Sequence, residues 1–308
     1  MTAVLMCFVA RWFVLPGLAL CIIADKDLAE ASDGGNKSRE QHGEDHGLET
    51  ENMFGFTVGS DTDQADAKSL AFETVGRFGK HGGNYSAIGS KFEFSYGVTD
   101  NISAALGVFA SYHDISGVPR FADVNSGGFN GIGGEVRWRL LSRESVPVGV
   151  TLQVEPSWQT RDEVTGLKGT KFGSENKLIF DTEFVPGHVL GAVNLLYEVE
   201  RFREDGTSQW EQQSKIGASA ALSFAIAPKL FVGGEGRYLR VYDGLLPNTY
   251  LGDGWFAGPT LFARIGSNGW ISAAWNIQLA GHEVGRSVSL NLTDFDRHQI
   301  KLKAGIEF

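Results

Sequence analysis

The sequence predicts an all-β protein, a closed antiparallel transmembrane β-barrel of about 12 strands with short periplasmic turns and longer extracellular loops. From Phe54 onward, apolar and polar residues alternate with a period of two, which is typical of strands with two different faces. The connections between these runs are alternately short and long. The chain also begins with an apolar export-type segment and ends on an alternating strand that closes with Phe308.

Residues 1–31 are typical of a secretory signal peptide. Arg11 precedes an apolar run from Trp12 to Ala24, and an A-x-A cleavage pattern follows at Ala29–Ala31. The run is shorter than the roughly 20 residues of a transmembrane helix, so an uncleaved N-terminal anchor is the weaker alternative. Both cysteines lie in this segment, and the mature chain is therefore expected to contain neither a disulfide nor a thiolate ligand.

Residues 32–53 are polar, acidic and without a period, which predicts a disordered periplasmic tail. His42 and His46 flank Glu44 and Asp45, but the neighbouring glycines disfavour the helix that would bring the two histidines together. We therefore expect no metal site. The formal net charge of −10 disfavours nucleic acid as a partner.

Residues 54–308 form the predicted outer-membrane β-barrel. Counting backward from Phe308 gives eleven strands, the earliest over about 86–97, and a twelfth falls within 68–78. An even number suits a bacterial barrel. Phe54–Val58 is left over from this count, and a lead-in strand, a piece of the first strand and a plug all remain open for it.

The connections follow the alternation that a transmembrane barrel requires. The expected short turns lie at 98–101, 142–147, 185–187, 227–229 and 267–269. The expected long loops lie at 114–127, 160–171, 203–209, 243–254 and 281–295. A soluble sandwich gives no reason for such alternation.

The apolar face of the predicted strands is assigned to lipid, because aromatic residues gather at both of its ends as they do at membrane interfaces. A soluble secreted β-domain with its charges outward is the alternative. The polar face is then the lumen, and its acidic and basic residues are balanced. The candidates for lining a solute path are Glu135, Arg137, Arg139, Glu155, Lys177, Glu198, Arg237 and Arg264. Each of them could equally form a structural ion pair in the wall.

The last strand, residues 301–308, places Leu302 and Ile306 towards lipid and Lys301 and Lys303 towards the lumen. It must pair with the first strand near 68–78, because an open sheet edge is not tolerated in lipid. Phe308 resembles the C-terminal aromatic signal that the barrel-assembly machinery reads, so we expect it to be an assembly signal.

Three stretches carry a resemblance to a known group of proteins: Glu73–Lys80 (ETVGRFGK), Lys91–Asp100 (KFEFSYGVTD) and Glu135–Leu141 (EVRWRLL). They resemble an uncharacterised proteobacterial family of Gram-negative outer-membrane β-barrel proteins, loosely grouped with the MetA-pathway phenol-degradation type of transporter. The resemblance implies the fold over roughly residues 54–308, and it brings no catalytic residue to carry over. By analogy alone it points to aromatic compounds as solutes.

The expected function is an outer-membrane channel or transporter for small solutes, with rings of lumen charge setting its selectivity. The alternative is a non-conducting structural, adhesive or sensing barrel. A lesser alternative is a phospholipase-type enzyme, which we disfavour because His113 and Ser116 point to opposite sides of their strand. We expect no enzyme activity and no cofactor. The expected partners are outer-membrane lipids, the barrel-assembly machinery and small-molecule solutes.

Overall fold

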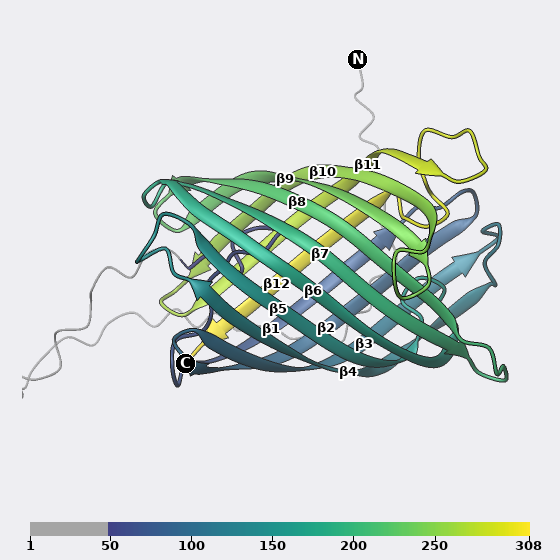
Figure 1. Ribbon diagram of the computed structural model, residues 1–308, viewed down its shortest axis with the longest axis horizontal. Helices are drawn as coiled ribbons and strands as arrows, with labels where there is room; N and C mark the ends of the chain where they lie inside the picture. The colour runs from purple at the N-terminus through teal and green to yellow at the C-terminus, as the bar shows by residue number, and fades with distance from the viewer. Residues whose placement is uncertain (1–48) are drawn as a thin grey trace, which may run out of the picture. The chain divides into compact units, whose positions relative to one another are not determined.

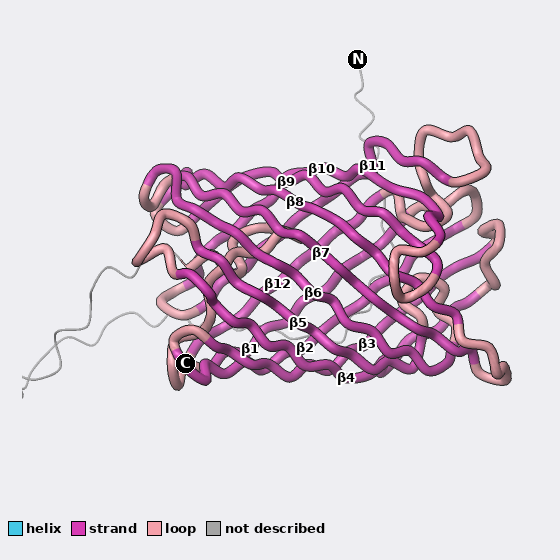
Figure 2. The backbone as a smooth tube through the Cα atoms, viewed as in Figure 1, coloured by secondary structure: helices cyan, strands magenta, loops and turns pink. Residues whose placement is uncertain are grey.

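The computed structural model describes residues 49–308. The predicted signal peptide, 1–31, and most of the predicted tail, 32–48, lie outside the described residues. Among residues 49–308, no helix is long and apolar enough to cross a membrane. The described part of the chain is all-β, as predicted (Figure 2).

Twelve strands form the wall, each hydrogen-bonded to the next along the chain (Figure 1). Their bounds are β1 Lys68–Phe78, β2 Asn84–Thr99, β3 Ile102–Ser116, β4 Val124–Leu141, β5 Gly149–Arg161, β6 Lys168–Val185, β7 Val189–Glu204, β8 Glu211–Ala227, β9 Leu230–Asp243, β10 Thr249–Ile265, β11 Gly269–Glu283 and β12 His298–Glu307.

The first and last strands close the barrel, as the sequence predicts. β1 pairs antiparallel with β12 from Ser69 opposite Glu307 to Phe78 opposite His298. The backbone of Phe308 continues this pairing, because it exchanges hydrogen bonds with the backbone of Lys68 at 2.9 and 3.3 Å. The sheet therefore has no free edge, which is the condition for a sheet in lipid.

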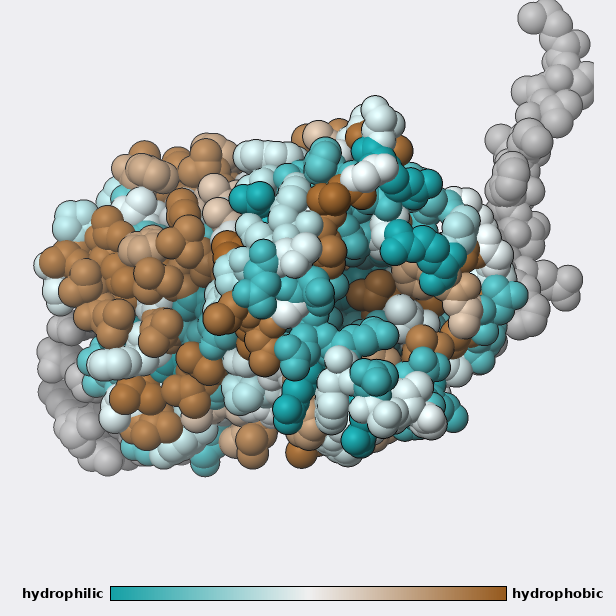
Figure 3. All heavy atoms as spheres, turned by 45° about the vertical axis from the view of Figure 1, so that its right-hand side comes forward, coloured by the Kyte–Doolittle hydropathy of each residue, from teal (hydrophilic) through white to brown (hydrophobic). Residues whose placement is uncertain are grey.

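Alternation along each strand separates an apolar outer face from a polar inner face. The outer side chains include Leu106, 73% exposed, and Phe184, 63% exposed. The inner side chains include Thr151 and Asn276, both fully buried. Brown apolar residues cover much of the wall in Figure 3, whereas the end turned towards the viewer carries mostly hydrophilic residues around a recess. The outer face thus suits a hydrocarbon solvent.

The five short turns lie within two residues of their predicted positions, and they share one end of the barrel with the C terminus, here called the short-turn end (Figure 1). The long loops are shorter than expected. The loop predicted at 114–127 spans only 117–123, and the one predicted at 243–254 spans only 244–248. The strands extend beyond the apolar stretch because neighbouring strands continue to exchange backbone hydrogen bonds there.

Residues 49–67, here called the inner segment, precede β1. Residues 49–62 run inside the barrel at the short-turn end, and residues 64–66 are exposed beside the turn between β2 and β3. Thr50 is fully buried and Met53 is 1% exposed, so the part of the chain packed in the lumen begins before the predicted boundary at residue 54. Phe54–Val58, left over from the strand count, belongs to this segment and is not a strand. Of the three options for it, the structure agrees with the plug, which occupies the short-turn end of the lumen.

Candidate functional site: the lumen and its inner segment

The inner segment is a compact loop that folds back on itself. The Met53 amide donates to the Thr50 carbonyl at 3.1 Å, and the Gly59 amide donates to the Glu51 carbonyl at 3.4 Å. Neither contact continues into a ladder, so most of the remaining backbone polar groups of the loop need partners on the wall. The wall supplies them from β4, β5, β6, β7 and β9.

Two inward side chains on β7 and β9 hold the middle of the loop. The Glu235 carboxylate accepts the amides of Phe56 and Thr57 at 3.0 and 2.9 Å. The Asn194 side chain accepts the Val58 amide and donates to the Val58 carbonyl, both at 2.8 Å. Hydrogen bonds to a charged group contribute about 1.5–3 kcal/mol each, so Glu235 is a strong anchor.

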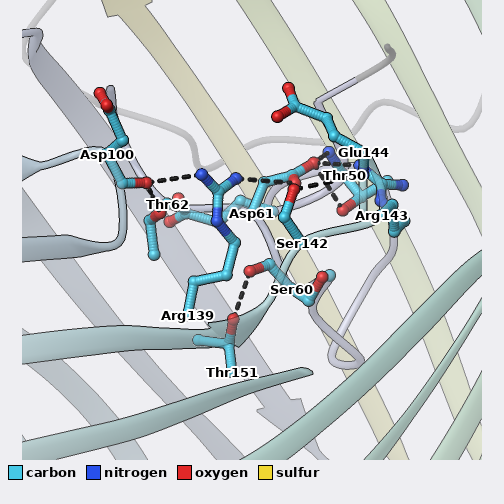
Figure 4. Close-up of polar contacts among 12 residues, drawn as sticks. Thr50, Ser60, Asp61, Thr62, Asp100, Arg139, Ser142, Arg143, Glu144 and Thr151 are labelled. Atoms are coloured by element: carbon cyan, nitrogen blue, oxygen red, sulfur yellow. Dashed lines mark hydrogen bonds and ion pairs between the residues drawn. The ribbon is translucent and has the colours of Figure 1, made fainter. Parts of the chain in front are cut away.

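Asp61 is held by Arg139 near the end of β4 and by Arg143 in the turn between β4 and β5, as Figure 4 shows. Arg143 pairs with the Asp61 carboxylate, and Arg139 lies 3.7 Å from it. The fully buried Thr151 hydroxyl donates to the Ser60 carbonyl in the same network. These contacts fix the end of the loop that returns to the wall.

The side chain of Arg137 on β4 binds the backbone of the inner segment. Its guanidinium donates to the carbonyls of Gly59 and Asp61 at 2.6 and 2.9 Å and to the Gln153 side chain at 3.1 Å. Only 2% of Arg137 is exposed. This residue therefore anchors the loop, and it also borders the first lumen cavity described below.

The loop also buries apolar surface against the wall. Met53 and Phe54 pack with Leu190, Phe231 and Phe262, whose side chains point into the lumen at the short-turn end. Burying such side chains contributes about 1.5–3 kcal/mol each. The contact between the inner segment and the wall is therefore both hydrophobic and hydrogen-bonded.

Gly55 lies so close to the wall that a Cβ there would be 2.4 Å from the Ala274 Cβ and 2.5 Å from a Glu235 oxygen. The next residue, Phe56, lies under Arg237, with 3.8 Å between the guanidinium carbon and the ring centroid. Position 55 therefore requires glycine, because the backbone approaches the wall closely, and position 56 requires an aromatic ring to contact the Arg237 cation.

Asp63 lies in the inner segment at the short-turn end and accepts a hydrogen bond from the Ser95 hydroxyl. Burial, together with the nearby Glu51 and Glu307 carboxylates, raises the pKa of Asp63 to about 6, although Ser95 and Arg137 act in the opposite direction. The charge of this residue therefore changes within a mildly acidic pH range.

Beyond the inner segment the lumen holds two adjoining cavities of about 220 and 240 Å³, which share lining residues on β1, β6, β7 and β12. The charged residues common to both cavities are Glu73, Arg77, Glu163, Lys171, Glu175, Lys177, Glu198, Glu200 and Lys301. Cavities of this size admit small solutes and water, and their walls are strongly polar.

Ion pairs between side chains on the inner faces of the strands neutralise much of this charge. Lys91 lies 2.5 Å from Glu155 and also contacts Glu93, and Lys215 lies 2.8 Å from Glu198. The Lys301 ammonium lies 2.9 Å from Glu73, which joins the two strands that close the barrel. Buried charges are tolerated when they are paired in this way.

Two loops fold into the opposite, long-loop end of the lumen. Lys80, whose side chain is 1% exposed, donates to the Phe295 carbonyl at 2.8 Å and pairs with Asp296 at 3.1 Å. The Tyr85 hydroxyl donates to the Val164 carbonyl at 2.8 Å. The loops at 162–167 and 284–297 thus narrow the opening of the lumen at the long-loop end.

The structure brings most of the predicted lumen residues together. Glu135, Glu155, Lys177 and Glu198 border the first cavity together with Arg137, and Lys177 and Glu198 also border the second cavity together with Arg237. Arg139 and Arg264 lie apart from both cavities, at the short-turn end. Arg264 borders a smaller pocket beside Glu49 and Asn52, and Arg139 holds Asp61.

Sequence reasoning did not identify the anchors of the inner segment, which are Arg143, Asn194, Glu235 and Asp181. The Asp181 carboxylate accepts the Ser60 amide at 2.8 Å. Alternation does place Asn194 and Glu235 on inner faces, and this signal marks them as lumen residues. The partners of these four anchors lie 82 to 179 positions away in the chain, and no local pattern reveals such pairs.

Glu93, Glu135 and Glu155 place carboxylate oxygens within 4.8 Å of one another. Lys91 pairs with both Glu93 and Glu155, so an ammonium already provides the positive charge for this cluster. The donor set therefore fits a charge-compensated wall better than a metal site.

The comparisons with known proteins agree with this architecture. A family model described as a family of unknown function, DUF6662, matches residues 46–308. The chain belongs to DUF6662. No curated protein sequence matches this DUF6662 chain.

Solved structures similar to the DUF6662 barrel are outer-membrane β-barrel proteins. The COG4313 outer membrane channel from Pseudomonas putida F1 aligns with a TM-score of 0.51 and 10% identity, over 81% of this chain and 98% of that one. The translocator domain of the autotransporter NalP from Neisseria meningitidis aligns with a TM-score of 0.47 and 13% identity, over 81% of this chain and 91% of that one. At such low identity the likeness concerns the fold alone.

Proposed function

We propose that this protein is an outer-membrane channel for small polar or charged solutes, and that the inner segment gates it. The observation that carries the proposal is the pair of charge-lined cavities that end on a loop of the protein's own chain. A wall of paired charges keeps water and ions in the lumen, and displacement of the loop would extend the cavities towards the periplasm. Rings of charged side chains set selectivity in such pores.

The solute class follows from the wall. The residues common to both cavities are mainly carboxylates, ammonium groups and a guanidinium, which favour solutes that carry charge or hydrogen-bonding groups. The aromatic compounds suggested by the resemblance have no support in this lining, and the grouping with MetA-pathway transporters remains a prediction.

A disulfide that locks the loop provides the decisive experiment. An ideal Cβ on Gly149 lies 3.1 Å from the Ser60 Cβ, slightly less than the usual spacing in a disulfide of about 3.5–4.5 Å. The double variant Ser60→Cys/Gly149→Cys joins the inner segment to the first residue of β5. In planar bilayers we expect the oxidised variant not to conduct and its reduced form to conduct. The two forms are compared with each other, because a Cβ on Gly149 also lies 2.5 Å from an Asp181 oxygen and can loosen the loop by itself.

Two further chains sharpen this test. A variant that lacks residues 49–62 should conduct more often than the wild type, and the single variant Ser60→Cys should not respond to oxidation. Equal conductance of the oxidised and reduced double variants would show that solutes do not pass the inner segment. If neither the wild type nor any of these variants conducts, including the variant that lacks residues 49–62, the proposal that the protein is a channel is wrong.

The second candidate is a non-conducting structural, adhesive or sensing barrel. The observation in its favour is that chain occupies both ends of the lumen, with Arg137 holding the inner segment and Lys80 holding the loop at 284–297. Such a barrel would act through its long loops. Surface accessibility mapping combined with partner capture would support it if the loop-deleted chain proves silent in bilayers.

We also propose an outer-membrane location, for which the apolar outer face and the similar outer-membrane barrels are the support. The absence of enzyme activity remains a proposal. Its support is that His113 is buried on the inner side of β3, with its Nε2 3.1 Å from the Glu163 carbonyl, whereas Ser116 is exposed. A lipase assay on the purified barrel tests it.

A further inference from the structure

The outer wall carries an unusual cluster near the long-loop end. Arginines stand there on a mostly apolar face, together with aromatic rings and the carboxylate of Asp253. We define the arginine–aromatic band as Arg201, Arg203, Trp210, Arg240, Tyr242 and Tyr250, from β7 to β10. Alternation turns these arginines outward, because their neighbours Phe202, Leu239 and Val241 are buried on the lumen side.

Arg240 has aromatic neighbours but no anionic partner. Its guanidinium lies 4.5 Å from the Tyr250 ring centroid and 5.5 Å from that of Tyr242. Its Nε is buried and has no hydrogen-bond acceptor. Asp253 sits opposite on β10, but its carboxylate accepts the Tyr250 and Tyr238 hydroxyls at 2.6 and 3.1 Å. Among residues 49–308, no carboxylate lies within ion-pair distance of Arg240.

The two arginines on β7 repeat this arrangement. Arg201 lies over both Phe172 and Trp210, 5.1 and 4.9 Å from their ring centroids, and Arg203 lies 4.8 Å from the centroid of Trp210. Neither has an ion-pair partner within the described part of the chain. The opposite wall differs, since the outward positions at this level of β3 and β4 carry Tyr112, Asp114 and Phe129.

An arginine that faces lipid without a counter-charge is costly, and an anion from the surroundings would offset this cost. Near the long-loop end the side chains can reach the level of the lipid headgroups, where long basic residues extend to meet polar groups. The planar guanidinium suits phosphate, and the rings hold it in place from one side.

We propose that the arginine–aromatic band binds the phosphate-bearing headgroup of an outer-leaflet lipid. The bound anion would give Arg201, Arg203 and Arg240 the counter-charge that the wall lacks, and would hold the lipid beside β7–β10. This site lies outside the barrel, so it does not depend on whether the lumen conducts; it does depend on the proposed membrane location.

The test uses the full chain in nanodiscs of phosphatidylcholine that contain either phosphorylated lipid A or the same lipid with its phosphates removed. Retained lipid is counted by native mass spectrometry. The wild type should retain the phosphorylated form. The double variant Arg201→Gln/Arg240→Gln should retain at most about one tenth as much of this lipid. Arg201→Lys/Arg240→Lys should keep much of the binding, because it keeps the charge.

The matched control is Arg286→Gln, which removes a half-exposed arginine in the loop between β11 and β12. Heat-modifiable mobility on gels verifies that every variant is folded. Equal retention by the wild type and the double glutamine variant overturns the proposal, and so does equal retention of the two lipid forms by the wild type. A change in oligomeric state without a change in lipid retention also overturns it, since the band would then be a contact between copies.

Discussion

The guanidinium carbon of Arg237 lies 3.8 Å from the centroid of the Phe56 ring, so a cation of the β9 wall covers an aromatic ring of the inner segment. Lys301 approaches the same ring at 5.7 Å from the β12 side. The two wall strands are thus linked through one side chain of the loop, and the loop's position depends on this contact as well as on its hydrogen bonds.

Replacing Phe56 by Ala should loosen the inner segment. A cation–π contact out of water is worth about 2 kcal/mol, which corresponds to a shift of about 30-fold between the docked and displaced loop. If the loop gates the channel, the open fraction in single-channel recordings should rise accordingly. The matched control is Phe72→Ala, which removes a half-exposed ring from the outer face of β1. An open fraction that changes equally in both variants would contradict the role of Phe56.

Gly55→Ala should displace the loop through steric overlap. The new methyl group would lie 2.4 Å from the Ala274 Cβ and 2.5 Å from a Glu235 oxygen, distances at which one side must move. Loss of the Glu235 hydrogen bonds would follow. We expect faster protease cleavage within residues 49–62 and more frequent channel opening.

Gly236→Ala is the control for this change. It lies next to Glu235 on β9, and the nearest atom to an added Cβ is 3.8 Å away. Cleavage and opening in this variant should match the wild type. The steric explanation fails if the two alanine variants behave alike.

The docking of the inner segment should weaken as pH rises through about 6. The pKa of Asp63 in the docked loop is raised to about 6, so the docked form holds a proton more tightly than the free loop does. The resulting stabilisation is complete below the ordinary carboxyl pKa of 3.8 and is lost as pH increases past 6. The open fraction should therefore be larger at pH 7.5 than at pH 5.

Asp63→Asn removes the titrating group, and its open fraction should depend less on pH over this interval. Recordings at constant ionic strength separate this effect from screening of the lumen charges. More opening at pH 5 than at pH 7.5 in the wild type would reverse the sign and reject the assignment to Asp63.

Deletion of Phe308 should reduce the amount of barrel in the outer membrane more than it alters the conductance of the barrels that form. The residue is 62% exposed at the end of β12, and only its backbone supports the seam with β1. Its side chain is therefore free for recognition during assembly. The measurement is the heat-modifiable fraction in outer-membrane preparations.

Phe224→Ala is a suitable comparison, because Phe224 is a lipid-facing aromatic at the same end and is 45% exposed. We expect this variant to assemble nearly normally. Equal losses in both chains would mean that any aromatic residue at this interface contributes, and that the terminal position has no special role.

The alternation of residues determined the wall of this protein. Each strand has to offer one face to lipid and the other to a polar interior, so Lys301 and Lys303 on one side and Leu302 and Ile306 on the other suffice to place β12 and its faces. The same requirement accounts for the lengths of the turns, the number of strands, which is twelve, and the pairing of residues 68–78 with the last strand. All three follow because a sheet in lipid must close.

The tertiary structure alone decided what occupies the lumen. Phe56 meets Arg237, and Val58 meets Asn194, across more than a hundred residues, and these contacts exist only once the wall has closed. The sequence of the inner segment has no period, since its hydrogen bonds go to wall side chains and not to a neighbouring strand. Local patterns report local geometry, and for this reason the charged residues of the lumen were predictable while the loop that Arg137 and Glu235 hold was not.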